Sequence, residues 1–362
     1  MTARLQNPAF IPVGDAREHL ARHLTSAGSV FQRGRPAGAP LHAEIWAAGI
    51  QVDDGDWFAL AAPQVAGSRV VQGTRGGTVC IERGGAHVWS AATGASTDAV
   101  LVAGDRVITG DRDGALRILR AADGTPIWSG RCQDWISGLC LAGDLLIAGS
   151  RDGHVRAWDA ASGTLVWATP LGARILATPR VAGKRVYVGS RDGRFYVLDL
   201  LSGAVEGSVQ TGSDIHGTAC VLGDAVLFGS DDKRVYCVDR DSLEVRWMFR
   251  TGDAVWAAPV AGYAGIVVAS TDGHVSLLDI ASGAPLWEVG VGGPVRLGLA
   301  ASFDTVCAVS ERGDVVLLAP ATGDVLASGR IAGPVWAAPA VSGDAFVIAS
   351  RANQLVAVKA GG

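Results

Sequence analysis

Short apolar stretches alternate with turns rich in glycine and aspartate along most of the chain, and this alternation repeats about every forty residues. The clearest unit covers residues 149–167: Gly-Ser-Arg-Asp-Gly, an apolar run, Asp-Ala-Ala-Ser-Gly and then a tryptophan. With Gly149 as the anchor, equivalent positions are Gly73, Gly110, Gly149, Gly189, Gly229, Ala269, Val309 and Ala349. The first two steps are 37 and 39 residues, and every later step is 40. Eight copies at this period predict a propeller or a solenoid.

The residues inside each unit predict strands. The run before the anchor is short and β-branched or aromatic, as in Val186-Tyr187-Val188. A turn such as Gly143-Asp144 precedes the run, a turn such as Asp152-Gly153 follows the anchor, and a turn such as Ser162-Gly163 comes third. Asp-Gly between apolar runs is typical of a tight hairpin, because the turn needs positive φ. Three turns join four antiparallel strands, so we predict an all-β, eight-bladed β-propeller.

Tryptophans recur near the end of the units. Trp128, Trp167, Trp247 and Trp287 stand eighteen residues after their anchors, and Trp89 is two residues off that register. We expect each ring to lie on the outermost strand and to cover the seam with the next blade. Gly207 and Ala327 occupy the same place in two units, so two seams must be packed differently.

The last unit ends after its third strand, at residues 355–358, which leaves no room for a fourth. Residues 44–46, Glu-Ile-Trp, look like an isolated outer strand ahead of the first unit. We predict that this strand completes the last blade and removes two open sheet edges. Residues 1–41 form a predicted N-terminal extension, with one short helix at about 15–27 and then a linker, and residues 42–362 form one propeller domain.

The repeat Gly-Ser-x-Asp-Gly, Asp-x-x-Ser/Thr-Gly, Trp resembles that of PQQ-type, quinoprotein-like β-propellers over roughly residues 44–360. That family includes quinoprotein alcohol dehydrogenases, and the resemblance implies that such activity would need an adjacent Cys-Cys pair, a Ca²⁺ site and long insertions. The sequence has no such pair and a nearly constant period, so we predict no quinone cofactor, no metal and no dehydrogenase activity. The family also includes a periplasmic lipoprotein of outer-membrane assembly, but residues 1–41 show no apolar signal segment.

The composition of the chain limits which partners we expect it to bind and in which cellular compartment we expect it. The formal net charge is −4 and the pI about 6.0, which argues against a nucleic-acid surface. The six cysteines are scattered and form no Cys-x-x-Cys motif, so we expect buried free thiols and a reducing compartment. No apolar run is long enough to span a membrane. We therefore expect a cytoplasmic protein without nucleic-acid or membrane partners.

Candidate functional residues are those that break the repeat. The position thirteen residues before each anchor holds Leu60, Thr97, Ile136, Leu176, His216, Trp256, Arg296 and Trp336. Two residues earlier stand Phe58, Ala95, Asp134, Arg174, Asp214, Ala254, Pro294 and Pro334. A spacing of two places both rows on one side of the innermost strand, near one mouth of the channel. Connecting loops add Trp57, Trp135 and Asp253 beside them.

Two constellations follow from these rows. His216, Trp256, Arg296 and Trp336 come from four adjacent blades and could hold a planar or anionic ligand by stacking, cation–π contact and charge. Asp134, Arg174 and Asp214 come from three adjacent blades and form a possible charge ladder. For both sets the alternative is purely structural, as packing between blades and as an internal ion-pair network.

Two functions remain open at this point. The first is a non-enzymatic module that binds a partner protein or a small molecule at the channel mouth. The alternative is an enzyme of lyase, hydrolase or cyclase type at the same mouth. In that case His216 would be the general base, Asp214 would orient it, and Arg174 or Arg296 would bind an anion.

Overall fold

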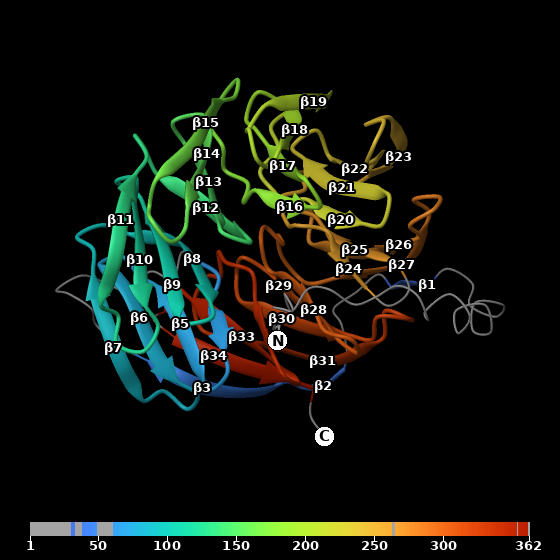
Figure 1. The fold of residues 1–362 in the computed structure, drawn as a ribbon. Coiled ribbons are helices and arrows are strands. Elements are labelled where there is room, and N and C mark those ends of the chain that lie inside the picture. Colours follow the sequence, from blue (N-terminus) through green and yellow to red (C-terminus); the bar gives the residue numbers. More distant parts are fainter. Residues whose placement is uncertain (1–29, 33–37, 49–60, 263–264, 353, 361–362) are drawn as a thin grey trace, which may run out of the picture.

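The computed structural model describes residues 30–32, 38–48, 61–262, 265–352 and 354–360, and in this part of the chain it is built from strands without a helix (Figure 1). Eight sheets follow one another around a central axis, and every sheet contains four antiparallel strands. The predicted eight-bladed propeller is therefore confirmed. The helix expected at about 15–27 lies outside the described residues. Among the described residues, no helix is long and apolar enough to cross a membrane.

The blades are numbered here in chain order. Blade 1 comprises β4 (Gln64–Ala66), β5 (Arg69–Gly73), β6 (Gly77–Glu82) and β7 (His87–Ala92). Blade 2 comprises β8 (Thr97–Ala103), β9 (Arg106–Asp111), β10 (Ala115–Arg120) and β11 (Pro126–Arg131). Blade 3 comprises β12 (Ile136–Ala142), β13 (Leu145–Ser150), β14 (His154–Asp159) and β15 (Leu165–Pro170). Blade 4 comprises β16 (Arg180–Ala182), β17 (Arg185–Gly189), β18 (Arg194–Asp199) and β19 (Val205–Gln210).

The second half of the ring follows the same plan. Blade 5 comprises β20 (Cys220–Leu222), β21 (Ala225–Ser230), β22 (Arg234–Asp239) and β23 (Val245–Arg250). Blade 6 comprises β24 (Val260–Ala261), β25 (Ile266–Ala269), β26 (His274–Leu278) and β27 (Pro285–Gly290). Blade 7 comprises β28 (Leu299–Ala301), β29 (Val306–Val309), β30 (Asp314–Leu318) and β31 (Val325–Arg330). Blade 8 comprises β32 (Ala340–Ser342), β33 (Ala345–Ser350), β34 (Gln354–Lys359) and, from the N-terminal part of the chain, β3 (His42–Ala48).

The first strand of each blade lies innermost, because the first strands of neighbouring blades contact one another, including β32 of blade 8 and β4 of blade 1. The second and third strands carry the core, and almost every residue of β21 and β33 is buried. The apolar clusters cross from each blade to the next. One of them joins Val347 of blade 8 to Val70 and Ile81 of blade 1. The core is thus a ring of inter-blade layers around the axis.

Strand β3 closes the ring as predicted. It pairs antiparallel with β34 from His42 to Ala48, which joins an N-terminal strand to the last strand of the chain in one sheet. Trp46 is 8% exposed and packs in the cluster shared by blades 8 and 1, whereas Ile45 on the same strand is 56% exposed. The closing strand therefore contributes a buried indole to the seam that joins the two ends of the repeat.

Two further strands come from the N-terminal extension. β1 (Val30–Gln32) pairs parallel with the outer strand β27 of blade 6, and β2 (Ala39–Pro40) pairs parallel with the outer strand β31 of blade 7. These sheets consequently have five strands. The boundary that we placed between residues 41 and 42 stays a prediction, but parts of the extension belong to the sheets of blades 6 and 7.

The seam tryptophans lie on the outer strands as expected. In each of five seams the indole Nε1–H donates to a backbone carbonyl in the third turn of the next blade. The bonds are Trp89–Ala121 (2.9 Å), Trp128–Ala160 (3.0 Å), Trp167–Leu200 (3.0 Å), Trp247–Ile280 (2.9 Å) and Trp287–Pro320 (3.0 Å). The ring lies on the glycine of that turn. These glycines have φ of 70–74°, and a Cβ on any of them would come within 3.0 Å of the indole.

The seam between blades 4 and 5 has exchanged the two partners. Gly207 stands where the other seams have tryptophan, and Leu243, with φ of 60°, stands where the next blade has its turn glycine. A Cβ on Gly207 would lie 2.7 Å from Leu243 Cδ1. The large side chain has therefore moved to the other side of the seam, and Leu243 packs on the cluster shared by blades 4 and 5.

All six cysteines are free. Cys80, Cys132, Cys237 and Cys307 are buried, while Cys140 and Cys220 are half-buried. Burial raises the pKa of the thiols of Cys80, Cys132 and Cys237 to about 11.

Closure gives the first prediction. Trp46→Ala should lower the free energy of unfolding by about 3–5 kcal/mol, because it empties a site in the seam between blades 8 and 1. Ile45→Ala on the same strand is the matched control and should cost well under half as much, since that side chain is exposed. Thermal and urea unfolding of both variants would measure this. Equal losses would contradict the closure that we describe.

The exchanged seam gives a double-mutant cycle. Gly207→Trp should destabilise the protein by about 1–3 kcal/mol, because the new side chain meets Leu243. Adding Leu243→Gly should restore the pattern of the other seams and recover much of that loss, so the two changes should be coupled. Leu201→Gly, at an exposed turn position, is the control and should recover nothing. The exchange would be refuted if the changes in urea midpoint caused by the substitutions at positions 207 and 243 were simply additive in the double variant.

The thiol pKa values give a labelling prediction. At pH 8 a thiol with a pKa of about 11 is ionised in roughly one molecule in a thousand, and the thiolate is the reactive form. Cys80, Cys132 and Cys237 should therefore react with iodoacetamide far more slowly in the folded protein than in urea, as peptide mass spectrometry would show. Similar rates in both states would contradict their burial.

Candidate functional site

One backbone hydrogen bond recurs at the same end of blades 2–8 and aligns the candidate residues. The N–H of the residue two positions after each anchor donates to a carbonyl just before the innermost strand. The pairs are Arg112–Ser96 (2.9 Å), Arg151–Trp135 (2.9 Å), Arg191–Arg174 (3.1 Å), Asp231–Asp214 (2.9 Å), Thr271–Ala254 (2.9 Å), Glu311–Pro294 (2.7 Å) and Arg351–Pro334 (2.8 Å). The second-named residues form what we call the entry row. They lie at one end of the ring, which we call the mouth, where the hairpin after each anchor meets the segment before the innermost strand.

This bond corrects the alignment of two blades. In blade 3 the entry row contains Trp135, not Asp134 as we predicted from the sequence. We had assigned Ile136 to the variable position, which lies two residues after the entry row. Ile136 is fully buried, however, as Ile175 and Ile215 are, so the variable position of blade 3 is Ser137. In blade 2 the buried residue is Thr97, so Asp98 takes the variable position. The cause is the shorter first two steps of the repeat, together with register shifts at the start of β8 and β12.

The charge ladder of Asp134, Arg174 and Asp214 is therefore not a single row. Asp134 lies one residue off the entry row, and its carboxylate accepts the backbone N–H of Trp135 at 2.7 Å. Asp214 pairs with Arg191 at 2.6 Å, from the neighbouring hairpin. Arg174 is exposed in the row.

His216, Trp256 and Arg296 form one stacked series across blades 5, 6 and 7. The rings of His216 and Trp256 are stacked, with centroids 4.9 Å apart, and the Arg296 guanidinium lies 4.6 Å from the Trp256 ring centroid. Two carboxylates hold the series in place. Asp231 accepts the indole Nε1–H at 2.5 Å, and Glu311 accepts the Arg296 Nε–H at 2.8 Å. We call these five residues the stacked cluster.

The fourth predicted member of that row, Trp336, has another partner. It is 40% exposed, and the guanidinium of Arg351 lies 3.9 Å from its ring centroid. Asp253, predicted beside the row, pairs with Lys233 at 3.3 Å. Trp57, Phe58 and Leu60 lie outside the described residues.

His216 also lies close to two carboxylates. Its Nε2 is 3.2 Å from Asp231 Oδ2 and 3.7 Å from Asp214 Oδ2. The possible ligand atoms of these three residues lie within 4.8 Å of one another, so among the described residues this group could hold a metal ion. Other partners already hold both carboxylates, since Trp256 donates to Asp231 and Arg191 to Asp214. The His216 Nε2 itself is buried without a hydrogen-bond partner among the described residues, so the plane of the ring is fixed by its stacking on Trp256.

Arginines form a row at the mouth that our sequence analysis missed. The position two residues after each anchor holds Arg75, Arg112, Arg151, Arg191, Asp231, Thr271, Glu311 and Arg351. The five arginines belong to consecutive blades, 8, 1, 2, 3 and 4, and we call them the arginine crescent. We had interpreted Gly-Ser-Arg-Asp-Gly only as a hairpin. A comparison of that one position between units would have revealed the row.

Aromatic rings and carboxylates fix several of these arginines. The guanidinium groups of Arg112 and Arg151 lie 4.2 Å and 3.4 Å from the Trp135 ring centroid. Arg112 Nε also donates to Asp98 at 2.8 Å. Burial, and then the neighbouring charges of Arg112 and Arg174, lower the pKa of Arg151. The crescent therefore concentrates positive charge at the mouth.

The crescent opens on a cavity of about 580 Å³ that blades 8, 1 and 2 share. Its lining includes Arg75, Arg112, Arg351, Trp336 and Ser96. Because residues from three blades line it, the cavity spans the seam where the ring closes. This is the cavity in the described structure that combines the missed arginines with a predicted tryptophan.

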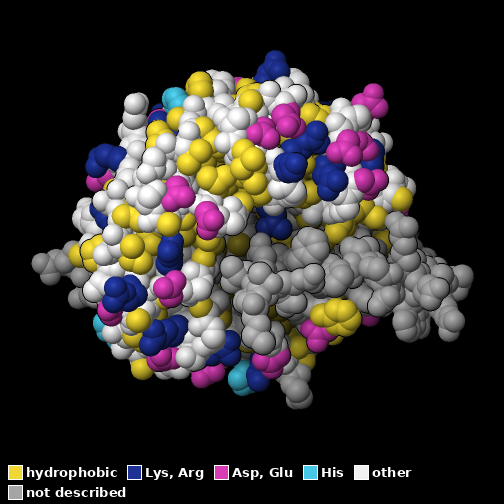
Figure 2. Space-filling model, in the orientation of Figure 1, with side chains coloured by type: hydrophobic (Ala, Val, Ile, Leu, Met, Phe, Trp, Pro, Cys, Tyr) yellow, Lys and Arg dark blue, Asp and Glu magenta, His cyan; other side chains and the backbone are white. Residues whose placement is uncertain are grey.

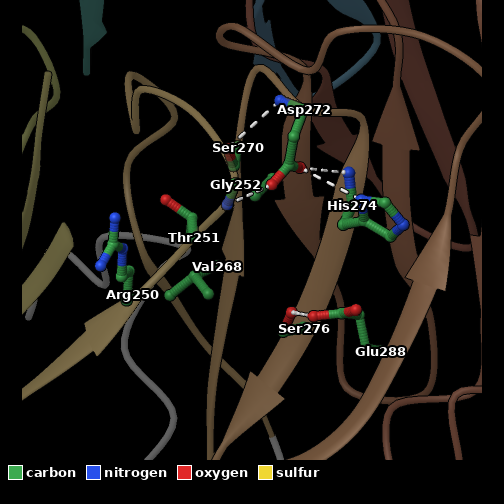
Figure 3. Close-up of a pocket in the computed structure, with 10 residues that line it drawn as sticks. Arg250, Thr251, Gly252, Val268, Ser270, Asp272, His274, Ser276 and Glu288 are labelled. Carbon is green, nitrogen blue, oxygen red and sulfur yellow. Dashed lines mark hydrogen bonds and ion pairs between the residues drawn. The ribbon is translucent and has the colours of Figure 1, made fainter. Parts of the chain in front are cut away.

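A second hollow, of about 220 Å³, lies between blades 5 and 6 (Figure 3). There Asp272 accepts the backbone N–H groups of Gly252 at 2.7 Å and His274 at 2.8 Å, and Ser276 donates to Glu288 at 3.2 Å. The bond from Gly252 ties the end of blade 5 to the hairpin of blade 6. Equivalent bonds join Gln133 to Asp152 and Gly212 to Asp232. The Asp272 carboxylate of this hollow therefore has a structural role in the seam between blades 5 and 6.

Figure 2 shows one face of the molecule, on which Lys and Arg side chains are interspersed with Asp and Glu. Over the described residues visible in this view, such mixing leaves no extended surface of one sign. The concentration of arginine at the mouth is thus a local feature of a chain whose net charge is −4.

Comparisons with known proteins agree with this architecture. A computationally designed protein, Ika8, has 19% sequence identity and a TM-score of 0.77, and the alignment covers 88% of this chain and 99% of that one. BamB from Moraxella catarrhalis has 19% identity and a TM-score of 0.73, covering 86% of this chain and 99% of that one. At this identity the likeness shows the fold alone. No curated protein matches the chain.

A family model described as outer membrane protein assembly factor BamB matches residues 133–248 and 208–361, which together make up more than half of the chain. The family model and the repeat in the sequence indicate the same family of proteins. The chain belongs to the PQQ-like, BamB-type β-propeller family.

Proposed function

We propose that this propeller is a non-enzymatic binding module that docks a partner protein across the mouth bearing the stacked cluster and the arginine crescent. The observation that carries the proposal is the recurring backbone bond of blades 2–8, because in each of these blades the same positions are aligned by it while their side chains differ. A position with a purely structural role would tend to keep one residue type, as the seam tryptophans do. Variation on a fixed frame is typical of a binding surface.

The residue types at the mouth favour a protein partner. Tryptophan and arginine are enriched at the centres of protein interfaces, and Trp336 and Arg296 are both substantially exposed. The stacked cluster is already held by Asp231 and Glu311, so little side-chain freedom would be lost on binding.

The charges at the mouth indicate which side chains a partner segment would carry. In the three rows at the mouth, arginine outnumbers aspartate and glutamate among the described residues, although the whole chain is acidic. A partner segment that carries acidic side chains would be attracted to this mouth, and its association rate should fall as salt is added.

The geometry favours binding over the enzymatic alternative. A general base needs one ring nitrogen held by an acid and the other directed at the substrate. Neither acid holds the ring in this way, because the buried Nε2 of His216 has no hydrogen-bond partner among the described residues although Asp214 and Asp231 lie near it, and Trp256 covers one face of the ring. The histidine is thus placed as a member of the stacked cluster.

The six free cysteines are consistent with a reducing compartment, and we propose that the partner is met in the cytoplasm.

Site-directed crosslinking tests the proposal. A photo-reactive phenylalanine analogue in place of Trp336 should trap one discrete protein in cells that produce the chain naturally. The same analogue in place of Leu201, an exposed residue on an outer turn, is the control and should not trap it. The trapped protein should be lost when Trp256→Ala and Arg296→Ala are added, while the melting temperature changes little.

Two outcomes would refute docking at this mouth. One is that position 336 traps nothing, or only what position 201 traps. The other is that the adduct persists at full yield in the variant without Trp256 and Arg296. A folded variant that no longer forms the adduct would support the proposal, and binding of the identified protein can then be measured directly.

A further inference from the structure

We infer that the cavity on blades 8, 1 and 2 is a binding site for a small molecule that carries phosphate groups. This inference goes beyond the proposed function, because it assigns a small ligand, and not a partner protein, to the part of the mouth formed by blades 8, 1 and 2. It shares the arginine crescent and Trp336 with the proposed function but makes no use of the stacked cluster.

The size of the cavity suits a small molecule. Its volume of about 580 Å³ lies within the range of roughly 300–1,000 Å³ that is usual for ligand sites. Hairpins from three successive blades surround it, so a ligand would contact several rigid elements at once. A cavity of this size admits an organic phosphate or a diphosphate but not a folded domain.

The side chains around the cavity suit phosphate. Arg75, Arg112 and Arg351 all line it, and the planar guanidinium fork donates two parallel hydrogen bonds to a phosphate group. Three guanidinium groups from different blades, each with five N–H donors, would supply donors for a phosphate in addition to the contacts that Arg75 and Arg351 already make. Ser96 also lines the cavity, but it is buried and its hydroxyl already donates to Asp98 at 2.9 Å. Asp113, also in the lining, is exposed at the rim.

Arg112 is already oriented. Asp98, whose side chain is 5% exposed, accepts the Nε–H of Arg112, and Trp135 lies against the guanidinium. This arrangement uses one edge of the fork and leaves the Nη groups for a ligand. An arginine that is held in this way loses little conformational entropy when an anion binds.

The surrounding charge makes the site attractive to anions. Arg112 and Arg151 lie against the same indole, and Arg174 is close enough to depress the pKa of Arg151. Like charges held together repel one another, and a bound anion relieves that repulsion. The attraction should weaken as the ionic strength rises.

Trp336 suggests that the ligand carries a planar group next to its phosphates. The indole lines the cavity and is 40% exposed, while Arg351 lies against its ring. A planar group that stacks on the remaining surface would add to the affinity supplied by the arginines. A nucleoside diphosphate combines both features and serves as a probe.

Calorimetry on the purified full chain tests the inference. Inorganic pyrophosphate should bind at low ionic strength, and ADP should bind more tightly than pyrophosphate. Arg112→Gln should weaken pyrophosphate binding by about tenfold or more, because it removes a charge-assisted contact. Arg120→Gln is the matched control: it makes the same charge change on the same blade at an exposed position near the opposite end of the sheet, and it should leave the affinity unchanged.

Arg75→Gln is a second variant, chosen because that side chain is exposed and its loss leaves Asp98 paired with Arg112. It should also weaken binding. Trp336→Ala should remove the advantage of ADP over pyrophosphate and leave pyrophosphate binding intact. The inference is overturned if pyrophosphate does not bind the parent protein, or if folded Arg112→Gln and Arg75→Gln proteins bind it as Arg120→Gln does. Because no partner protein is present, either result is separate from the crosslinking experiment.

Discussion

The fold depends on one contact that is repeated between blades: an outer-strand tryptophan that lies on the turn glycine of the next blade and donates its indole N–H to that turn. In the five seams that have this contact the hydrogen bonds are 2.9–3.0 Å long. This contact explains both the tryptophan and the turn glycine of the repeat, because the indole occupies the space that a side chain on the turn residue would need. The seam of Gly207 and Leu243 confirms the dependence, since both partners changed and the space remained filled.

These seams make the channel mouth a fixed frame. When each blade is held to its neighbours through the outer turns and through hairpin carboxylates such as Asp272, the inner hairpins keep their positions whatever side chain they carry. The frame then accepts tryptophan, arginine, histidine or proline at equivalent positions without a change in the backbone bond. A rigid scaffold with variable residues at one end separates stability from recognition, so the two can be altered independently.

The sequence predicted the elements that are set by local chemistry. Strands, hairpins, seam tryptophans and the closing strand follow from apolar runs, Asp-Gly turns and a missing fourth strand. Side-chain placement at the mouth was predicted less well, because steps of 37 and 39 residues had to be aligned with steps of 40. Counting from the following anchor put Ile136 at the mouth, whereas a register shift buries it. The parallel strands β1 and β2 were missed because strands of two or three residues leave no periodic signal.

The position of the arginine cavity links recognition to closure of the ring. Its lining combines Trp336 and Arg351 of blade 8 with Arg75 of blade 1, and blade 8 is completed by β3 from the other end of the chain. An anion held by Arg351 and Arg75 would bridge the one seam at which the repeat begins and ends. A ligand that binds only the closed ring stabilises that ring by mass action. A phosphate ligand in this cavity would therefore stabilise the closing seam, and the five blades that do not line the cavity need take no part.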